Sequence, residues 1–235
     1  MSWIRLRQVA LVASELSRVL GELHETFGLE VAFRDPGVAT FGLQNAVLPV
    51  GNQFIEVVSP VEEGTAGGRQ LERLGGDGGY MVICHTDDHP TVRARVAELG
   101  VRTAIDVEDH GYRIMQLHPS DTGGSFLEID FQPGGEDPNG PWMPAGPEWQ
   151  QARRTDVVSG ITAVQVQSRD PGKTAARWGE ITALDVANGA LQLDNATVTF
   201  VEGPIDSLVG VTLVATDRAR AGEQRRICGV RFLLS

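Results

Sequence analysis

Two glutamates occur where the chain is otherwise strongly apolar. Glu56 lies in QFIEVVSP (53–60), and Glu128 lies in LHPSDTGGSFLEID (117–130), in a strand-like run that it shares with Asp130. A glutamate in a strand usually faces water, because burying a charged side chain without a partner is unfavourable. Two carboxylates that line one pocket instead repel each other, so that one of them holds a proton or a cation lies between them. Either arrangement suits proton transfer.

The position of these glutamates in a repeated pattern favours the pocket. Glu56, Glu128 and Glu202 occupy the same place in three similar segments of the chain. For the first two, we therefore expect side chains that face a pocket and remove or deliver a proton next to a carbonyl group. One glutamate would act as the base, while a metal ion or a hydrogen-bond donor stabilises the enolate.

Other polar residues lie where they could contact a ligand. Gln8 is the first polar residue of a strand that otherwise looks buried, and a hydrogen-bonded core amide is the equally favoured interpretation. Tyr80 and His118 are candidate substrate contacts by their placement. Asn45 and Arg113 lie in central strands, from which they could reach a carbonyl or a carboxylate. For Tyr80 and His118 a structural role is at least equally favoured.

A repeated order of elements must position these residues. An apolar strand, a turn and a helix begin at residues 8, 81 and 162, and a fourth, weaker start lies at 210. Strand-like pieces follow each of the first three helices, so the unit is β-α-β-β-β. In the first unit the helix is expected at 14–29, ending at Gly28, and the strands at 31–35, 39–49 and 53–60. The fourth unit is expected to end in one strand, 229–235.

A segment rich in Pro and Gly separates the second unit from the third. Residues 132–150 lack periodicity, which is typical of a linker. Trp142 and Trp149 should pin this segment to the body of the protein, because exposed tryptophans in a loose loop favour aggregation. The predicted organisation is a first domain at 1–132, a linker at 133–156 and a second, truncated domain at 157–235.

Composition limits the classes of function. The chain has 235 residues and a net charge of −11, which argues against nucleic acid and anionic membrane surfaces as partners. Cys84 and Cys228 show no metal-binding spacing and are expected to be reduced thiols. No apolar run approaches the roughly 18 residues that a membrane-spanning helix needs. We expect a cytoplasmic protein that acts on a small molecule.

The paired units resemble the vicinal oxygen chelate superfamily, which contains the glyoxalase-like proteins. LHPSDTGGSFLEID is similar to the closing segment of methylmalonyl-CoA epimerases, and GGDGGYMVICHTDD (75–88) is similar to the start of their second unit. The resemblance covers residues 4–132 well and 157–235 loosely. It implies an α+β fold in which paired β-α-β-β-β units form curled, mixed sheets with helices outside.

The resemblance also implies a divalent metal site at the centre of the sheet. Its four ligand positions fall on Gln8, Glu56, Met81 and Glu128. Three of them match ligands used in the family, whereas Met81 stands where histidine is expected, and a thioether suits hard cations poorly. The prediction is therefore an incomplete site of Gln8, Glu56 and Glu128 that binds Zn²⁺, Ni²⁺, Co²⁺, Mn²⁺ or Mg²⁺, or no metal at all.

The leading hypothesis is a lyase or isomerase with Glu56 and Glu128 as catalytic acid/base groups and Gln8 assisting. A second hypothesis is a metal-free protein that sequesters a hydrophobic small molecule in the same pocket, which Met81 favours. A third is an assembly module with a vestigial pocket, in which the glutamates would be exposed or paired to arginine. The pocket is completed either by a second copy of the chain or by residues 157–235, so the protein is a homodimer or a monomer.

Overall fold

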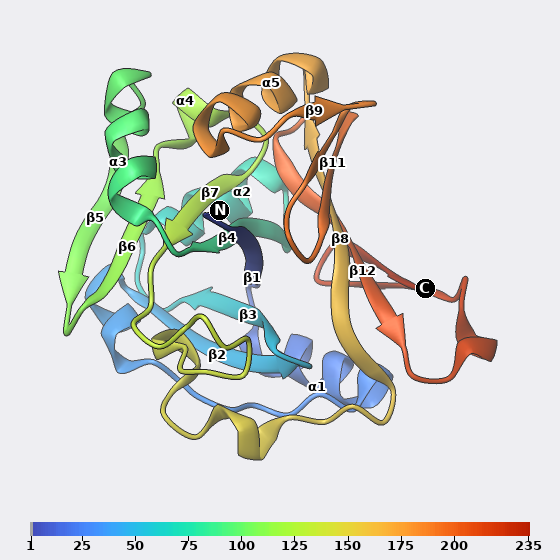
Figure 1. Ribbon diagram of the computed structural model, residues 1–235. Coiled ribbons are helices and arrows are strands. Elements are labelled where there is room, and N and C mark those ends of the chain that lie inside the picture. The colour runs from blue at the N-terminus through green and yellow to red at the C-terminus, as the bar shows by residue number, and fades with distance from the viewer. Residues whose placement is uncertain (1) are drawn as a thin grey trace.

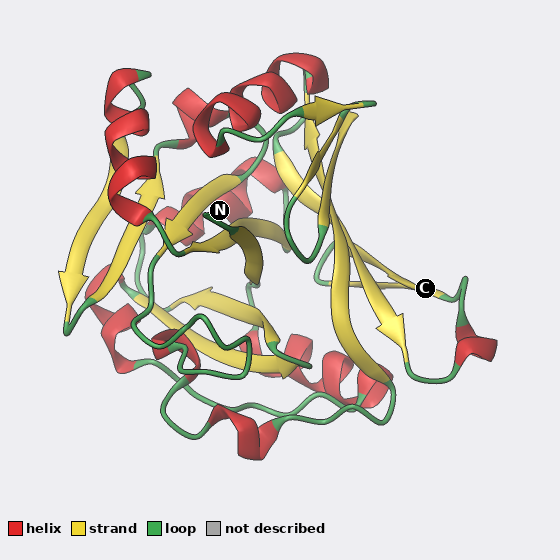
Figure 2. Ribbon diagram, viewed as in Figure 1, coloured by secondary structure: helices red, strands yellow, loops and turns green. Residues whose placement is uncertain are grey.

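The computed structural model describes residues 2–235, which form two seven-stranded mixed sheets with helices at their margins (Figure 1, Figure 2). The helices are α1 (Leu16–Phe27), α2 (Ala66–Leu74), α3 (His89–Glu98), α4 (Pro119–Thr122) and α5 (Pro171–Thr182). The α+β architecture with curled mixed sheets confirms the predicted fold class.

The first sheet is built from the first two units. Its strands are β1 (Ile4–Val12), β2 (Leu43–Val50), β3 (Gln53–Pro60), β4 (Gly78–Thr86), β5 (Thr103–Asp109), β6 (Tyr112–Leu117) and β7 (Phe126–Asp130). Their order is β2-β3-β1-β4-β7-β6-β5, so the first strand of each unit lies at the centre. β1 and β4 run antiparallel, while β3 and β7 lie parallel to β1 and β4 respectively.

The second sheet repeats this order with the last two units. Its strands are β8 (Val158–Ser168), β9 (Val186–Ala187), β10 (Ala190–Gln192), β11 (Thr197–Glu202), β12 (Ser207–Ala215), β13 (Gln224–Ile227) and β14 (Val230–Leu234). They lie in the order β13-β14-β12-β8-β11-β10-β9. The strand expected at 229–235 is present as β14, but β13 pairs with it in a hairpin, so the expectation that the fourth unit ends in one strand was wrong. The charged run Gln224–Arg226 hid the first strand of this hairpin, because an edge strand needs no apolar face.

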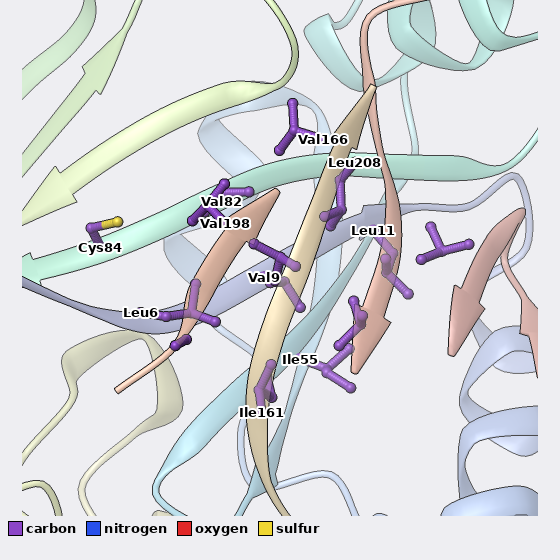
Figure 3. Packing of buried hydrophobic residues seen from close by; sticks show 14 of the residues in the cluster. Leu6, Val9, Leu11, Ile55, Val82, Cys84, Ile161, Val166, Val198 and Leu208 are labelled. Carbon is purple, nitrogen blue, oxygen red and sulfur yellow. The ribbon is translucent and has the colours of Figure 1, made fainter. Parts of the chain in front are cut away.

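One hydrophobic cluster joins the two sheets. Figure 3 shows Val9, Leu11 and Ile55 of the first sheet directed toward Ile161 and Leu208 of the second. The apolar stripe of α1 joins this cluster through its buried residues and ends at Gly28, whose left-handed backbone closes the helix as the sequence predicts. The two sheets therefore share one core. The division into domains at 1–132 and 157–235 stays a prediction.

The sheets approach each other closely where glycines lie between them. A Cβ atom on Gly79 of β4 would lie 1.9 Å from the carbonyl oxygen of Leu208 in β12. A Cβ atom on Gly51, in the turn between β2 and β3, would lie 2.1 Å from the carbonyl oxygen of Ser159. Both distances are far below van der Waals contact. The backbones of the two sheets therefore touch directly at these points.

Two local features differ from the sequence prediction. Residues 31–35 form no strand: Phe33 makes one isolated bridge to Val47, and a 3-10 helix (Pro36–Phe41) follows. Helix α2 was not predicted, because its sequence AGGRQLERL starts with two glycines that disfavour a helix. Its N-terminus is instead capped by the Thr65 side chain, which accepts a hydrogen bond from the amide of Gly68.

The linker of residues 133–156 packs on the first sheet. Trp142 and Trp149 are each 1% exposed, and the ring of Phe54 lies against both. Arg7 of β1 donates hydrogen bonds to the carbonyl oxygens of Pro138 and Gly140 at 2.6 and 3.4 Å. The tryptophans thus anchor the linker, which covers part of the sheet face that the second sheet leaves free.

Candidate functional site

Polar side chains gather on the face of the first sheet that is turned away from the second sheet, which we call the site face. The apolar residues of this face form a cluster of their own, separate from the one between the sheets. In the strand register Gln8 lies beside Phe54, and Glu56 lies beside Ala10 one row further along. Met81 and Glu128 hold the equivalent places on β4 and β7. The four positions named by the resemblance therefore share one face.

Glu56 is buried and held by two side-chain amides. Asn45 on β2 donates a hydrogen bond to Oε1 at 2.6 Å, and Gln8 on β1 donates to Oε2 at 2.8 Å. Burial raises the pKa of Glu56 above its usual value, while these two hydrogen bonds act in the opposite direction. The result is a carboxylate that is oriented by its neighbours and is more basic than one in water.

The orientation of the Gln8 amide is fixed from the linker. The indole Nε1 of Trp142 donates to Oε1 of Gln8 at 2.8 Å, which leaves the Gln8 Nε2 group to donate to Glu56. Gln8 is 1% exposed. Both ends of this amide are therefore satisfied, and a residue 134 positions away in the chain decides which end faces Glu56.

Glu128 and Asp130 form a buried pair of carboxyl groups on β7. The two side chains are hydrogen-bonded to each other, and Asp130 also accepts from the hydroxyl of Tyr112 and from the amide of Met115. Burial raises the pKa of Asp130 to about 7, and it raises the pKa of Glu128 well above the usual range, with the nearby charges of Asp130 and Glu56 adding to the effect. The pair therefore retains a proton near neutral pH.

A cavity of about 470 Å³ opens next to this pair, and we call it the α2–β6 cavity. Gln116 lines the cavity and also donates to Oε2 of Glu128 at 3.3 Å, so one side chain connects the two. Phe126, two residues before Glu128 on the same strand, forms part of its wall. The other lining residues come from α2, from β5 and from the segments beside them: Phe41, Ala66, Arg69, Gln70, Arg73, Ala104, Ile105, His118 and Pro119.

The predicted substrate contacts are spread over different places. His118 lines the α2–β6 cavity, and Tyr80 is buried with its ring edge against Phe126. Tyr80 lies at an irregularity in the pairing of β1 with β4, so it shares the site face with its neighbour Met81. Asn45 donates its hydrogen bond to Glu56, as described above. Arg113 lies instead in a separate cavity beside α3, paired to Glu108 at 3.0 Å.

The residues on the site face do not fit a divalent cation at the four positions of the family. The Gln8 oxygen already accepts from Trp142, both oxygens of Glu56 accept from amides, and the Gln116 amide lies between Met81 Sδ and Glu128. A thioether is a soft ligand that suits hard cations poorly. Within residues 2–235, no group of three His, Cys, Asp or Glu side chains is placed to hold a metal ion.

Four residues on the site face were not singled out from the sequence. Tyr112 and Gln116 lie on β6, and only the pairing of this strand with β7 brings them to Asp130 and Glu128. Asp130 lies on β7 itself, two residues after Glu128. Trp142 was expected only to anchor the linker, and its contact with Gln8 could not be seen without the fold. The one available signal was the alternation that places Asp130 on the same face as Glu128.

Comparison with known proteins defines the class. A family model described as a glyoxalase-like domain matches residues 9–182, which is more than half of the chain. The chain therefore belongs to the glyoxalase-like domain family, within the vicinal oxygen chelate superfamily, whose fold serves small-molecule enzymes and binding proteins. The chain is similar to the ethylmalonyl-CoA/methylmalonyl-CoA epimerase of Cereibacter sphaeroides, at 26% identity over 130 residues, covering 54% of this chain and 96% of the epimerase.

Solved structures repeat the fold. A hypothetical protein from Staphylococcus aureus covers 99% of this chain and 98% of its own, with a TM-score of 0.74 at 13% identity. A methylmalonyl-CoA epimerase in complex with methylmalonyl-CoA and NH4+ covers 55% of this chain and 95% of its own, with a TM-score of 0.50 at 22% identity. Both likenesses concern the fold alone. No helix within residues 2–235 is both long and apolar enough to span a membrane.

Proposed function

We propose that the protein is an isomerase or lyase that transfers a proton at a carbon next to a carbonyl group. The observation that carries this proposal is the buried Glu128–Asp130 pair beside the α2–β6 cavity. A carboxyl group that retains a proton near neutral pH is suited to donate it to an enolate, and its conjugate base is strong enough to remove one. The relative named as an epimerase supports the same class of reaction.

Glu128 is the group that exchanges the proton with the substrate, because Gln116 connects it to the cavity wall. Glu56 supplies the second carboxylate, oriented by Asn45 and Gln8. Asp130, which is held by Tyr112, positions Glu128. In one turnover the Glu56 carboxylate takes the proton from the carbon and Glu128 donates its own proton to the enolate. Proton exchange with water then returns both groups to their starting forms. Two carboxyl groups on one face can serve opposite sides of a planar enolate, as an isomerase requires. The donor set on this face supplies no cation site, so the mechanism rests on these side chains.

Deuterium exchange from solvent into a substrate tests the proposal. Methylmalonyl-CoA, the compound in the name of the relative, is the first candidate, and exchange at its carbon between the two carbonyl groups is followed by mass spectrometry. We expect the wild type to catalyse exchange and Glu128→Gln to lose about 10²-fold or more of the rate, the usual size of an acid/base contribution. Glu56→Gln should also lose activity, since it keeps the shape but removes the charge.

Glu202→Gln is the matched control. Glu202 holds the corresponding position in the third unit, but it lies exposed on the second sheet. Its replacement should leave the exchange rate unchanged. Exchange that persists undiminished in Glu128→Gln would refute the proposed role of this residue. Other carbon acids with an adjacent carbonyl form the rest of the substrate panel.

A binding protein that sequesters a small molecule is the second candidate. The apolar residues beside the carboxyl groups favour it, above all Met81, Tyr80 and Phe126. It predicts ligands that raise the melting temperature without any exchange of deuterium. The third hypothesis, a vestigial pocket, required glutamates that are exposed or paired to arginine. In the described chain Glu56 and Glu128 are each only 8% exposed, and their hydrogen-bond partners are amides and a carboxyl group.

A further inference from the structure

We propose that the α2–β6 cavity binds an organic anion, whose carboxylate or phosphate group is received by Arg69 and Arg73 of helix α2. The proposal deepens the proposed function, since it names the substrate class of the same site. It applies equally to an enzyme and to a binding protein.

The charge of the cavity is opposite to that of the whole protein. The chain has a net charge of −11, yet the residues that line the α2–β6 cavity within residues 2–235 include two arginines and no aspartate or glutamate. An acidic protein that concentrates uncompensated positive charge in one concave site attracts anions there. Both arginines are exposed, so salt screens this attraction and low ionic strength favours it.

The two arginines keep hydrogen-bond donors free. Arg69 donates to the carbonyl oxygen of Gly64 at 2.6 Å, and Arg73 donates to Oε1 of Gln70 and to the carbonyl oxygen of Asp206 at 2.6 and 3.0 Å. In the described chain neither forms an ion pair with a carboxylate, in contrast to Arg93 or Arg113 beside the neighbouring cavity. Each guanidinium group has five N–H donors in a planar fork, which matches a carboxylate or a phosphate.

The spacing of Arg69 and Arg73 also points to an anion. They lie four residues apart on α2 and therefore on one face of the helix, where like charges repel and weaken the helix. Both arginines line the same cavity as Gln116, whose amide donates to Glu128. An anion bound between the two guanidinium groups would remove the repulsion and lie on the route toward Glu128.

The walls of the cavity require an apolar part in the same ligand. Phe41, Ile105 and Phe126 line it together with the arginines, and Phe41 is 53% exposed although it is large and apolar. A bare inorganic ion would leave these surfaces in water. A volume of about 470 Å³ admits a small organic acid or the end of a longer molecule. Gln116 at the inner wall then places the carbon chain of the ligand next to Glu128.

Three probes of similar shape test the binding. They are 3-phenylpropionate, 2-phenylethyl phosphate and the neutral 3-phenylpropanamide, titrated at low ionic strength and followed by ligand-observed NMR. We expect at least one of the two anions to bind wild type about tenfold or more tightly than the amide, as charge-assisted hydrogen bonds imply. The double variant Arg69→Gln, Arg73→Gln should lose that advantage. A loss for the propionate identifies a carboxylate site, and a loss for the phosphate alone identifies a phosphate site.

The double variant Arg225→Gln, Arg226→Gln is the control for net charge, because it also removes two positive charges. Both residues are exposed on β13 and donate to backbone carbonyl oxygens. This variant should leave all three affinities unchanged. The proposal is overturned if the amide binds as tightly as both anions, if the double variant keeps its preference for anions, or if no probe binds wild type at about 10 mM. Anion binding without deuterium exchange would keep this proposal and reject the proposed enzyme.

Discussion

The chemistry of the site depends on how three acidic groups share their protons. Tyr112, Glu128 and Asp130 are all buried, and each has a pKa above its ordinary value chiefly because burial disfavours its charged form. The hydrogen bonds from Tyr112 and Met115 stabilise the charged form of Asp130. Asp130 is thus the group that ionises first, and Glu128 is the one that keeps its proton.

Stability should therefore depend on pH in a characteristic direction. A carboxyl group whose pKa is higher in the folded protein binds more protons there than in the unfolded chain, so its contribution is full at low pH and is lost as pH rises through the folded pKa. For Asp130, whose pKa moves from 3.8 to about 7, the window lies between these two values. Acting alone, such a shift corresponds to on the order of 4 kcal/mol.

Urea unfolding at a series of pH values checks this expectation against Asp130→Asn, which keeps the shape of the side chain. The unfolding free energy of the wild type should fall relative to that of the variant as pH rises from about 4 to about 7. Glu202→Gln, at an exposed position, should run parallel to the wild type. If the Asp130→Asn curve also runs parallel to the wild type, Asp130 does not titrate in the way described.

At the level of residues, the sequence predicted which polar side chains of the strands matter but not the residues to which they are hydrogen-bonded. Glu56, Glu128 and Gln8 were predicted because carboxylates and amides in apolar strands are conspicuous. The catalytic roles of these residues stay predictions. Gln116 could not be assigned, because its contact with Glu128 depends on the pairing of β6 with β7. Asp130 lies two residues after Glu128 on the same strand, but its complete burial and its bond from Tyr112 could not be foreseen without the fold.

The linker is the element with the most direct influence on the site. It spans the site face beside β2 and β3, as Figure 1 shows, and its Trp142 contacts Gln8 while Trp149 packs on Phe54. Arg5 and Arg7 of β1 hold its backbone through carbonyl oxygens, including those of Gly135 and Pro138. A segment made mostly of loop, with two short 3-10 helices (Met143–Ala145 and Trp149–Ala152), is thus tied to the strands below it.

Replacing each tryptophan by phenylalanine separates these contributions. Trp142→Phe keeps an aromatic ring but leaves the Gln8 oxygen without its donor, which should cost about 1–3 kcal/mol of unfolding free energy. It should also lower the rate of the proposed deuterium exchange, because Gln8 no longer has a fixed orientation toward Glu56. Trp149→Phe, which loses only a bond to the Gly140 carbonyl oxygen, should lower stability without lowering the rate. Equal exchange rates in both variants would show that the linker shields the sheet but does not orient Gln8.

Elements were predicted where periodicity was strong and missed where tertiary contacts decide the structure. Helix α1 was expected from its apolar stripe and from Gly28, and both are present. Helix α2 and strand β13 were missed, since a glycine-rich start and a run of charges hide them. The missed helix carries Arg69 and Arg73. The cationic wall of the α2–β6 cavity was therefore not visible before the fold was known.

At the scale of the whole molecule, the second sheet buries the back of the first. The cluster between them contains residues of both sheets and of α1, α3 and α5. The solved protein from Staphylococcus aureus follows almost the entire chain, so the arrangement of two such sheets recurs at low sequence identity. Whether the protein acts as a monomer or a homodimer remains a prediction, although the second sheet covers the central strands of the first sheet on one face.

The direct contact between the sheets gives a prediction for Gly79. A methyl group there would meet the backbone of Leu208, which cannot move without shifting β12, so Gly79→Ala should lower the unfolding free energy by about 1–3 kcal/mol or more. Gly21→Ala is the matched control, because Gly21 lies inside α1 with no atom within 4 Å of the added group. That change should stabilise the protein by about 0.5–1 kcal/mol. Thermal and urea unfolding measure both, and a neutral Gly79→Ala would contradict the backbone contact.

Gly79 also lies two residues before Met81, on the strand that runs through the middle of the site face. A side chain at this glycine would push β4 away from the second sheet and would displace Met81 and Tyr80 with it. Within residues 2–235, the second sheet contributes no residue to the wall of the α2–β6 cavity. The second sheet nevertheless supports the strands of the site face from behind. Substitutions more than a hundred residues away in the chain can therefore shift the site without contacting it.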